Sequence, residues 1–363
     1  MGLFDFLKKK PSQNANERAS VKSPGTEGAS EQHRTASSPK EVDHSPSNSG
    51  LSLQERYGKA SLKAYQTGEW TEAIKEFKRL EDEGLGEASV ALGQYAQMDD
   101  KSKALAHFRK AAAKGVAEGS WGCAAIIGHA YQADIDGADK EWYAYCLRAA
   151  RGGCCDAMNE LGNMYNRRND YLGAFYWYQM AAYYEHPQGY SAAAGTISKY
   201  LAAGKPEIAS TIDGVRPNDV KSAISIFRCM TKQDILDQTR MDSFMHAAME
   251  DDNEMMGLFI GHFFEDVVKM DGNARMGYQL AAHNNSIIGM KCLADMQASG
   301  KGCERNMEAA AGWYQSAADA CEKTACFVMG EFLRTKKPNL AAYYYAAALR
   351  RGYEPAYQRL LQM

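Results

Sequence analysis

Small and aromatic residues recur at spacings of three and four from Leu51 onward, and short polar breaks such as Asp99-Asp100 and Asn169-Asp170 separate the runs. Residues three and four apart share one face of a helix. Alternation of apolar and polar residues with a period of two, which would indicate strands, is missing. The pattern therefore predicts an all-α chain of short helices joined by tight connections.

Two helix patterns alternate in this region. One reads small-x-x-aromatic-aromatic-x-x-Ala-Ala and is clearest around Trp177-Tyr178 and Trp313-Tyr314. The other reads small-x-x-x-aliphatic-Gly-x-x-aromatic, and its glycine recurs as Gly93, Gly128, Gly162, Gly195, Gly261 and Gly330. Because glycine inside a helix costs about 1 kcal/mol relative to alanine, we expect each of these glycines to lie at a close helix crossing. The alternation repeats about eight times, which predicts stacked helical hairpins.

The combined pattern resembles Sel1-like repeats, which are relatives of the tetratricopeptide repeat. The copy most typical of that family is the loop from Gly300 to Asn306 followed by Ala310, Trp313 and Tyr314. The resemblance covers roughly residues 57–357 and implies an all-α, right-handed α-solenoid superhelix of about eight hairpins. It also implies an open concave face, lined by the first helix of each hairpin.

Composition and repeat spacing divide the chain into five segments. Residues 1–10 are predicted to form a short amphipathic basic peptide. Residues 11–50, rich in Ser, Pro, Asn, Glu and Lys, are predicted to be a disordered linker, because they cannot bury enough apolar surface to offset the entropy of ordering. Residues 51–203 and 253–363 hold the N-terminal and C-terminal repeats. Between them, residues 204–252 break the even spacing and predict an irregular insertion with an extra helix.

Charge and cysteine usage narrow the range of partners. The formal net charge of −3 provides no global basic field, so we expect no nucleic-acid partner. The nine cysteines show no regular pairing and no zinc spacing, so we expect buried thiols, no metal and no cofactor. The run Tyr343-Tyr344-Tyr345 falls in an alanine-rich second helix, where core packing is expected rather than base stacking.

The N-terminal peptide provides a secondary hypothesis about location. We find no secretory signal, and no apolar run approaches the roughly 20 residues of a spanning helix, so a cytoplasmic protein is expected. A short helix of residues 1–10 would still place apolar side chains beside lysines and make a weak peripheral contact at the inner face of a membrane. The alternative is an inert or partner-docking terminus. The membrane-contact candidates are Leu3, Phe4, Phe6, Leu7, Lys8, Lys9 and Lys10.

The partner-binding candidates follow from the repeat. By analogy with the tetratricopeptide family, the residue after the recurring glycine should point partly into the concave face, and here it is polar. In the fourth hairpin, Asn159, Asn163 and Arg167 share one helical face and could bond a peptide backbone or a carboxylate. The alternative is an ordinary solvated face. The candidate set is Gln94, His129, Asn159, Asn163, Arg167, His262, Asp295 and Glu331.

The predicted function is a non-catalytic scaffold or adaptor that binds a segment of a partner protein on the concave face. One alternative is a dedicated inhibitor, or immunity-type binder, of a single protein. A second is a cell-envelope-related hydrolase, suggested by exported, cysteine-bridged relatives whose features this chain lacks. His129 and His262 have no nucleophile or carboxylate at a recognisable spacing, so we expect no catalytic residue. The oligomeric state stays open.

Overall fold

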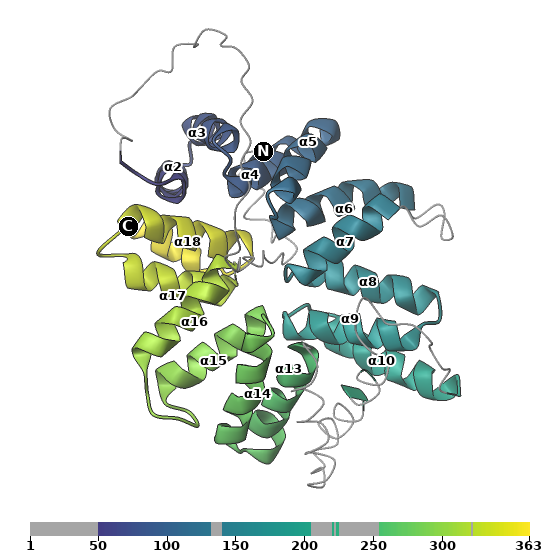
Figure 1. Cartoon of the computed structure of the whole chain (residues 1–363). Helices are drawn as coiled ribbons and strands as arrows, with labels where there is room; N and C mark the ends of the chain where they lie inside the picture. The colour runs from purple at the N-terminus through teal and green to yellow at the C-terminus, as the bar shows by residue number, and fades with distance from the viewer. Residues whose placement is uncertain (1–49, 132–139, 205–219, 221–222, 225–253, 321) are drawn as a thin grey trace, which may run out of the picture.

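The computed structural model describes residues 50–131, 140–204, 220, 223–224, 254–320 and 322–363. Every regular element in this part of the chain is a helix (Figure 1), so the predicted all-α fold is confirmed. The predicted peptide 1–10, nearly all of the linker 11–50 and most of the insertion 204–252 lie outside the described residues. The expectations attached to those segments, membrane contact included, therefore stay predictions.

The helices follow the predicted alternation of first and second helices. The first helices are α2 (Leu53–Thr67), α4 (Gly86–Ala96), α6 (Ala117–Tyr131), α8 (Cys155–Arg167), α10 (Gly189–Ala202), α13 (Glu254–His262), α15 (Ile287–Ser299) and α17 (Lys323–Leu333). The second helices are α3 (Thr71–Asp82), α5 (Lys101–Ala113), α7 (Lys140–Arg151), α9 (Tyr171–Tyr183), α14 (Asp271–His283), α16 (Met307–Asp319) and α18 (Pro338–Arg350). A π-helix, η1 (Phe263–Val268), continues α13, and α19 (Pro355–Leu361) ends the chain.

The polar breaks seen in the sequence begin second helices. The side chain of Asp100 accepts hydrogen bonds from the backbone N–H groups of Ser102 and Lys103 at the start of α5. Asp170 accepts one at the start of α9, and Asn306 accepts one at the start of α16. Each side chain satisfies a backbone donor that has no partner within its helix, so these residues determine where the helices start.

The recurring glycine marks the crossing within a hairpin. A Cβ atom added at Gly162 would lie 2.5 Å from Cδ1 of Tyr178, and one added at Gly330 would lie 2.4 Å from Cε1 of Tyr345. The predicted close crossing is therefore confirmed at these positions. At Gly195 a Cβ atom would meet no atom of the described residues within 4 Å. Most of the second helix expected to cross it lies outside the described residues, so the expectation for that glycine stays a prediction.

The Ala-Ala pair of each second helix marks the contact between hairpins. A Cβ atom added at Gly119, near the start of α6, would lie 2.4 Å from the Cβ of Ala111 in α5. One added at Gly289, near the start of α15, would lie 2.7 Å from the Cβ of Ala281 in α14. Small residues on both sides let the backbones of consecutive hairpins approach closely. This contact explains why the Ala-Ala pair recurs in the second helices.

The two ends of the repeat array meet. Helix α2 lies against α18 and closes the hairpins into a ring (Figure 1). A Cβ atom added at Gly58 would lie 2.0 Å from the carbonyl oxygen of Asn339, and the rings of Tyr57 and Tyr343 meet edge to face with centroids 5.9 Å apart. One apolar core therefore joins α2–α4 to α15–α19. The concave face that the resemblance implied does not end in two open edges.

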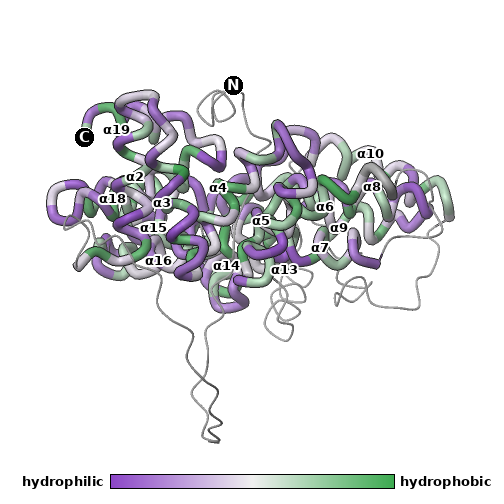
Figure 2. The backbone as a smooth tube through the Cα atoms, turned by 90° about the horizontal axis from the view of Figure 1, so that it is seen from above, coloured by the Kyte–Doolittle hydropathy of each residue, from purple (hydrophilic) through white to green (hydrophobic). Residues whose placement is uncertain are grey.

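Ion pairs connect the inner ends of helices on different sides of the ring. Arg351, at the end of α18, donates to Glu118 at the start of α6 over 2.9 Å, and both side chains are buried. Lys323, at the start of α17, pairs with Glu185 in the turn after α9. Edge-on, α4, α8 and α10 lie toward one side of the molecule, and α5, α7 and α9 lie toward the other (Figure 2). The first helix α13 also lies toward the side of α5, α7 and α9. We call the side of α5, α7 and α9 the second-helix layer.

The predicted core residues are largely buried. Among the described residues, five cysteine thiols are buried, and two more, those of Cys292 and Cys303, are partly buried. Tyr343, Tyr344 and Tyr345 are all buried, which confirms their packing role. None of the helices that the structure describes is both long enough and apolar enough to cross a membrane.

Candidate functional site

In several hairpins, a tyrosine of the second helix donates a hydrogen bond to a polar side chain of the first helix. That polar residue directly follows the recurring small residue of the first helix. The hydroxyl of Tyr178 donates to Oδ1 of Asn163 over 2.7 Å. The same contact joins Tyr314 to Asp295 over 2.6 Å and Tyr345 to Glu331 over 2.7 Å. Each acceptor is half-buried. We call Asn163, His262, Asp295 and Glu331 the polar row.

His262 occupies the corresponding position in the hairpin of α13 and α14. Its ring stacks on Tyr183 with centroids 5.0 Å apart and meets the edge of Tyr278 at 5.3 Å. The hydroxyl of Tyr278 lies 3.0 Å from Nδ1 of His262 and 2.5 Å from Oε2 of Glu265. A single hydroxyl proton satisfies both contacts if Tyr278 donates to Glu265 and accepts from the imidazole N–H.

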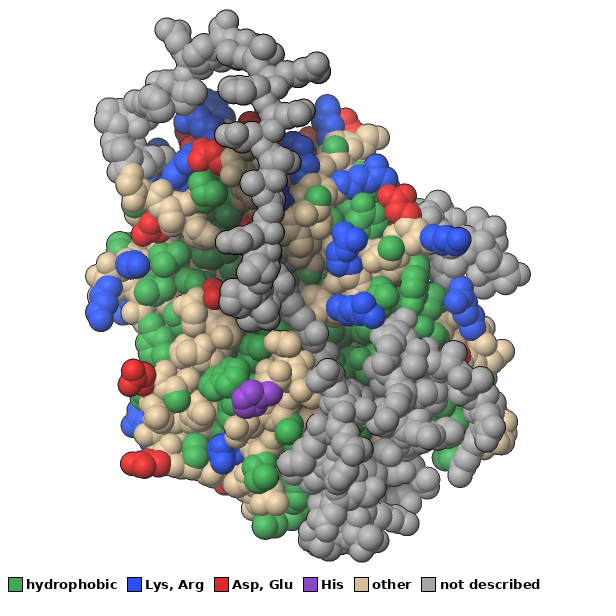
Figure 3. All heavy atoms as spheres, viewed as in Figure 1, with side chains coloured by type: hydrophobic (Ala, Val, Ile, Leu, Met, Phe, Trp, Pro, Cys, Tyr) green, Lys and Arg blue, Asp and Glu red, His purple; other side chains and the backbone are tan. Residues whose placement is uncertain are grey.

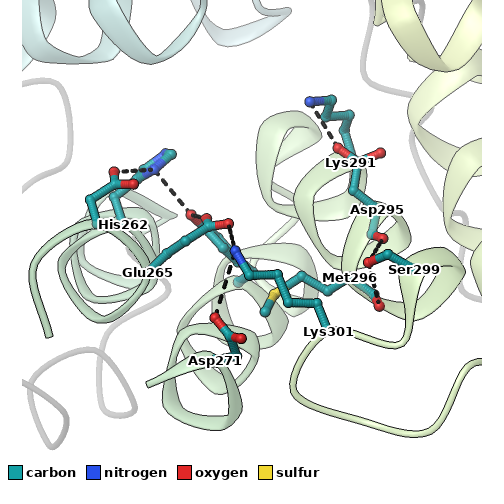
Figure 4. A network of polar contacts seen from close by, with 10 residues as sticks. His262, Glu265, Asp271, Lys291, Asp295, Met296, Ser299 and Lys301 are labelled. Carbon is teal, nitrogen blue, oxygen red and sulfur yellow. Dashed lines mark hydrogen bonds and ion pairs between the residues drawn. The ribbon is translucent and has the colours of Figure 1, made fainter. Parts of the chain in front are cut away.

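The π-helix η1 brings Glu265 to a loop of the next hairpin. Lys301, in the loop between α15 and α16, donates to Oε1 of Glu265 over 2.7 Å and lies 3.6 Å from Asp271 (Figure 4). Gly302, with φ at +70°, packs so closely that a Cβ atom would lie 2.4 Å from the carbonyl oxygen of Asp271. The ion pair and this backbone contact fix the position of the loop. π-Helices occur frequently at functional sites.

Charges of both signs line this part of the first helices. Lys291 pairs with Oδ2 of Asp295 over 2.9 Å, beside the bond from Tyr314 (Figure 4). Burial by itself lowers the pKa of Lys291, but the carboxylate of Asp295 raises it overall, so the side chain stays a cation. Burial raises the pKa of the neighbouring Cys292 to about 12, so this thiol stays protonated. The arrangement can offer donors, acceptors and charges to a polar ligand.

The remaining candidates lie in different surroundings. Asn159 is buried, whereas Arg167 is exposed. The three residues expected to form one face of α8 therefore differ in accessibility, and Asn163 also donates to Glu160 over 3.2 Å. His129 belongs to α6, but its side chain lies outside the described residues. Whether these side chains bind a partner stays a prediction.

The tyrosine contacts explain why one candidate differs from the others. In the hairpin of α4 and α5, the ring against the recurring Gly93 is Phe108, which has no hydroxyl group. The residue after that glycine is Gln94, and its buried Oε1 has no hydrogen-bond partner among the residues described. The sequence analysis missed these contacts. The signal that could have revealed them is a tyrosine in one pattern paired with an acceptor in the other.

Within the described ranges, no group of three or more His, Cys, Asp or Glu side chains is arranged to hold a metal ion. The polar contacts of His262 go to Tyr278 and Asp266. The network in Figure 4 can therefore fix side chains and present them to a ligand.

No family model matches the sequence, and no curated protein is similar to it. One solved structure that is similar is a protective antigen present in uropathogenic Escherichia coli strains and displaying an SLR (Sel1-like repeat) fold. It shares 21% identity over 86% of this chain and 74% of that chain, with a TM-score of 0.34. Another is a Sel1 repeat protein from Oxalobacter formigenes, with 16% identity over 83% of this chain and 93% of that chain and a TM-score of 0.35. Both descriptions name the Sel1 repeat, which the pattern of this sequence also resembles.

Proposed function

We propose that the chain is a non-catalytic scaffold or adaptor that binds a segment of a partner protein on its first helices. The observation that carries this proposal is the polar row, whose side chains are half-exposed and each held by a tyrosine. Side chains that are already fixed lose little conformational entropy when a ligand binds. The row is therefore preorganised for recognition.

The chemistry of the row suits a peptide. Asn163 offers an amide, His262 an imidazole, and Asp295 and Glu331 carboxylates, at corresponding positions of four hairpins, of which the last three are consecutive. An extended peptide presents backbone N–H and C=O groups at regular intervals, and such groups pair well with amides and carboxylates. Lys291, beside Asp295, adds a cation that a carboxylate of the partner can approach.

The experiment is affinity capture from native extract with the full chain as bait, compared with the double variant D295N/E331Q. Asn and Gln still accept the bonds from Tyr314 and Tyr345, whereas the ion pairs of Asp295 with Lys291 and of Glu331 with Arg359 are lost together with the two charges. We expect captured partners to bind the variant at least about tenfold more weakly, because each lost contact to a charge costs roughly 1–3 kcal/mol.

The matched control is E304Q/E308Q, which removes two exposed carboxylates outside the row. Circular dichroism should show the same helix content for all three proteins. Partners that bind D295N/E331Q as well as the original chain would contradict the proposal. Several ligands of micromolar affinity would indicate an adaptor, whereas one ligand of nanomolar affinity or tighter would indicate a dedicated inhibitor.

A further inference from the structure

The second-helix layer carries a cluster of exposed cations on α5 and α7. Figure 3, which views this layer, shows Lys and Arg side chains gathered over α5, α7 and the neighbouring end of α8. We call five of the exposed cations on and directly after these two helices the basic patch: Arg109, Lys114, Lys140, Arg148 and Arg151. Two further exposed lysines of α5, Lys103 and Lys110, are paired with Asp100 and Glu81. The patch is not part of the polar row, which belongs to the first helices.

One aromatic ring organises the centre of the patch. The guanidinium carbon of Arg148 lies 5.8 Å from the centroid of Tyr145, a cation–π distance. Arg109, from the neighbouring helix, donates to Glu141 over 2.8 Å. This bond, with a smaller contribution from Tyr145, raises the pKa of Arg109. Cations of two helices therefore lie near one aromatic ring, and Tyr145 positions the guanidinium of Arg148.

The patch has few counter-ions. Glu141 neutralises Arg109, but Lys114, Lys140 and Arg148 have no carboxylate within ion-pair distance in the part of the chain that the structure describes. Several other cations are paired, as Lys110 is with Glu81 and Lys301 is with Glu265. The chain as a whole carries a net charge of −3, so the patch is a local concentration of positive charge. Such a concentration attracts anionic groups.

We infer that the basic patch binds an acidic segment of a partner protein. Guanidinium groups pair with carboxylates through two parallel hydrogen bonds, and Lys114 and Lys140 add charge on either side. The extent of the patch favours a short segment over a nucleic acid or a membrane. On one side of the patch, α3 carries both lysines and exposed acidic residues, namely Glu72, Asp82 and, directly after it, Glu83. On the other side of the patch, α9 is buried from Leu172 to Ala181. An extended polyanion would meet those acidic groups.

This inference does not rest on the proposed function, because the two surfaces belong to different helices and share no residue. The test is fluorescence anisotropy with a short fluorescein-labelled polyglutamate peptide and the full chain. We expect saturable binding that weakens as salt is added, because exposed charges are screened beyond about 8–10 Å. The variant K140E/R148E reverses two unpaired cations and should weaken binding at least about tenfold.

The control R334E/K336E makes the same change of charge on exposed residues between α17 and α18. It should change the affinity less than about twofold. Equal loss in both variants, or no binding of polyglutamate, would overturn the inference.

Duplex DNA and phosphatidylserine vesicles serve as competitors. If either binds more tightly than polyglutamate and is lost in K140E/R148E, the protein segment is the wrong ligand class. Partner binding by the polar row is measured separately with D295N/E331Q. Either proposal can therefore be contradicted without affecting the other.

Discussion

At the scale of single residues, a glycine and a tyrosine act as a pair. The glycine of the first helix admits the tyrosine ring, and the tyrosine hydroxyl then reaches the polar residue that follows the glycine. Gly330, Tyr345 and Glu331 show all three parts of this contact. A side chain in place of the glycine would push the two helices apart and would also lengthen the hydrogen bond from the tyrosine. Helix packing and hydrogen-bond geometry therefore depend on the same position.

We predict that Gly330→Ala destabilises the protein. The added Cβ would lie 2.4 Å from the ring of Tyr345, and relief requires movement of a buried side chain. Overpacking of this kind costs roughly 1–3 kcal/mol. Urea denaturation measures the change. The matched control is Gly312→Ala in α16, where a Cβ meets no described atom within 4 Å, and where alanine should leave stability unchanged or raise it by about 0.5–1 kcal/mol. Equal effects at the two sites would contradict the packing argument.

At the scale of elements, the loop between α15 and α16 is held to the preceding hairpin by charge. Glu265 on η1 is the anchor, since it accepts from both Lys301 and Tyr278. Burial by itself raises the pKa of Glu265, but these two hydrogen bonds outweigh burial and lower it below the ordinary value of 4.5. The carboxylate therefore stabilises the folded chain in its ionised form.

A carboxyl group whose pKa is lower in the folded chain than in the unfolded chain stabilises the fold above its unfolded pKa. That stabilisation is lost as the pH falls through the folded pKa. We predict that Lys301→Met lowers the free energy of unfolding at neutral pH and that the difference from the original chain shrinks toward about pH 3. Urea denaturation at several pH values measures this. Lys336→Met, at an exposed lysine, should show no such trend. A difference that grows on acidification would disprove the role of Glu265.

At the scale of the whole molecule, the first and last hairpins cover each other. Solenoids need caps, because each terminal repeat leaves an apolar face without a neighbour. Here α2 covers α18, and Arg350 donates to the hydroxyl of Tyr57 over 2.7 Å inside the seam. Tyr343 donates to Glu87 over 2.8 Å across the same seam. Closure into a ring thus satisfies both ends of the array.

We predict that Gly58→Ala opens this seam. The added Cβ would lie 2.0 Å from the carbonyl oxygen of Asn339, a backbone atom that no change of rotamer can move. Small-angle X-ray scattering should show a larger radius of gyration, and the midpoint of urea unfolding should fall. Gly312→Ala is the control, because a Cβ there meets nothing within 4 Å. An unchanged radius of gyration together with unchanged stability would show that the ring does not depend on this contact.

The sequence by itself determined the all-α class, the order of first and second helices and most of the close glycine crossings. These follow from local rules, since periodicity, capping side chains and small residues act within a helix or between consecutive helices. The close crossings at Gly162 and Gly330 could therefore be predicted from the sequence without coordinates.

Only the tertiary structure decided the ring and the partners of the polar side chains. The meeting of α2 with α18 depends on the small rotation from each hairpin to the next, and those rotations accumulate over the whole array. The bond from Tyr314 to Asp295, and the two guanidinium groups around Tyr145, depend on which faces of two helices meet. Local periodicity carries no information about accumulated rotation or facing side chains, because both are set by packing between elements.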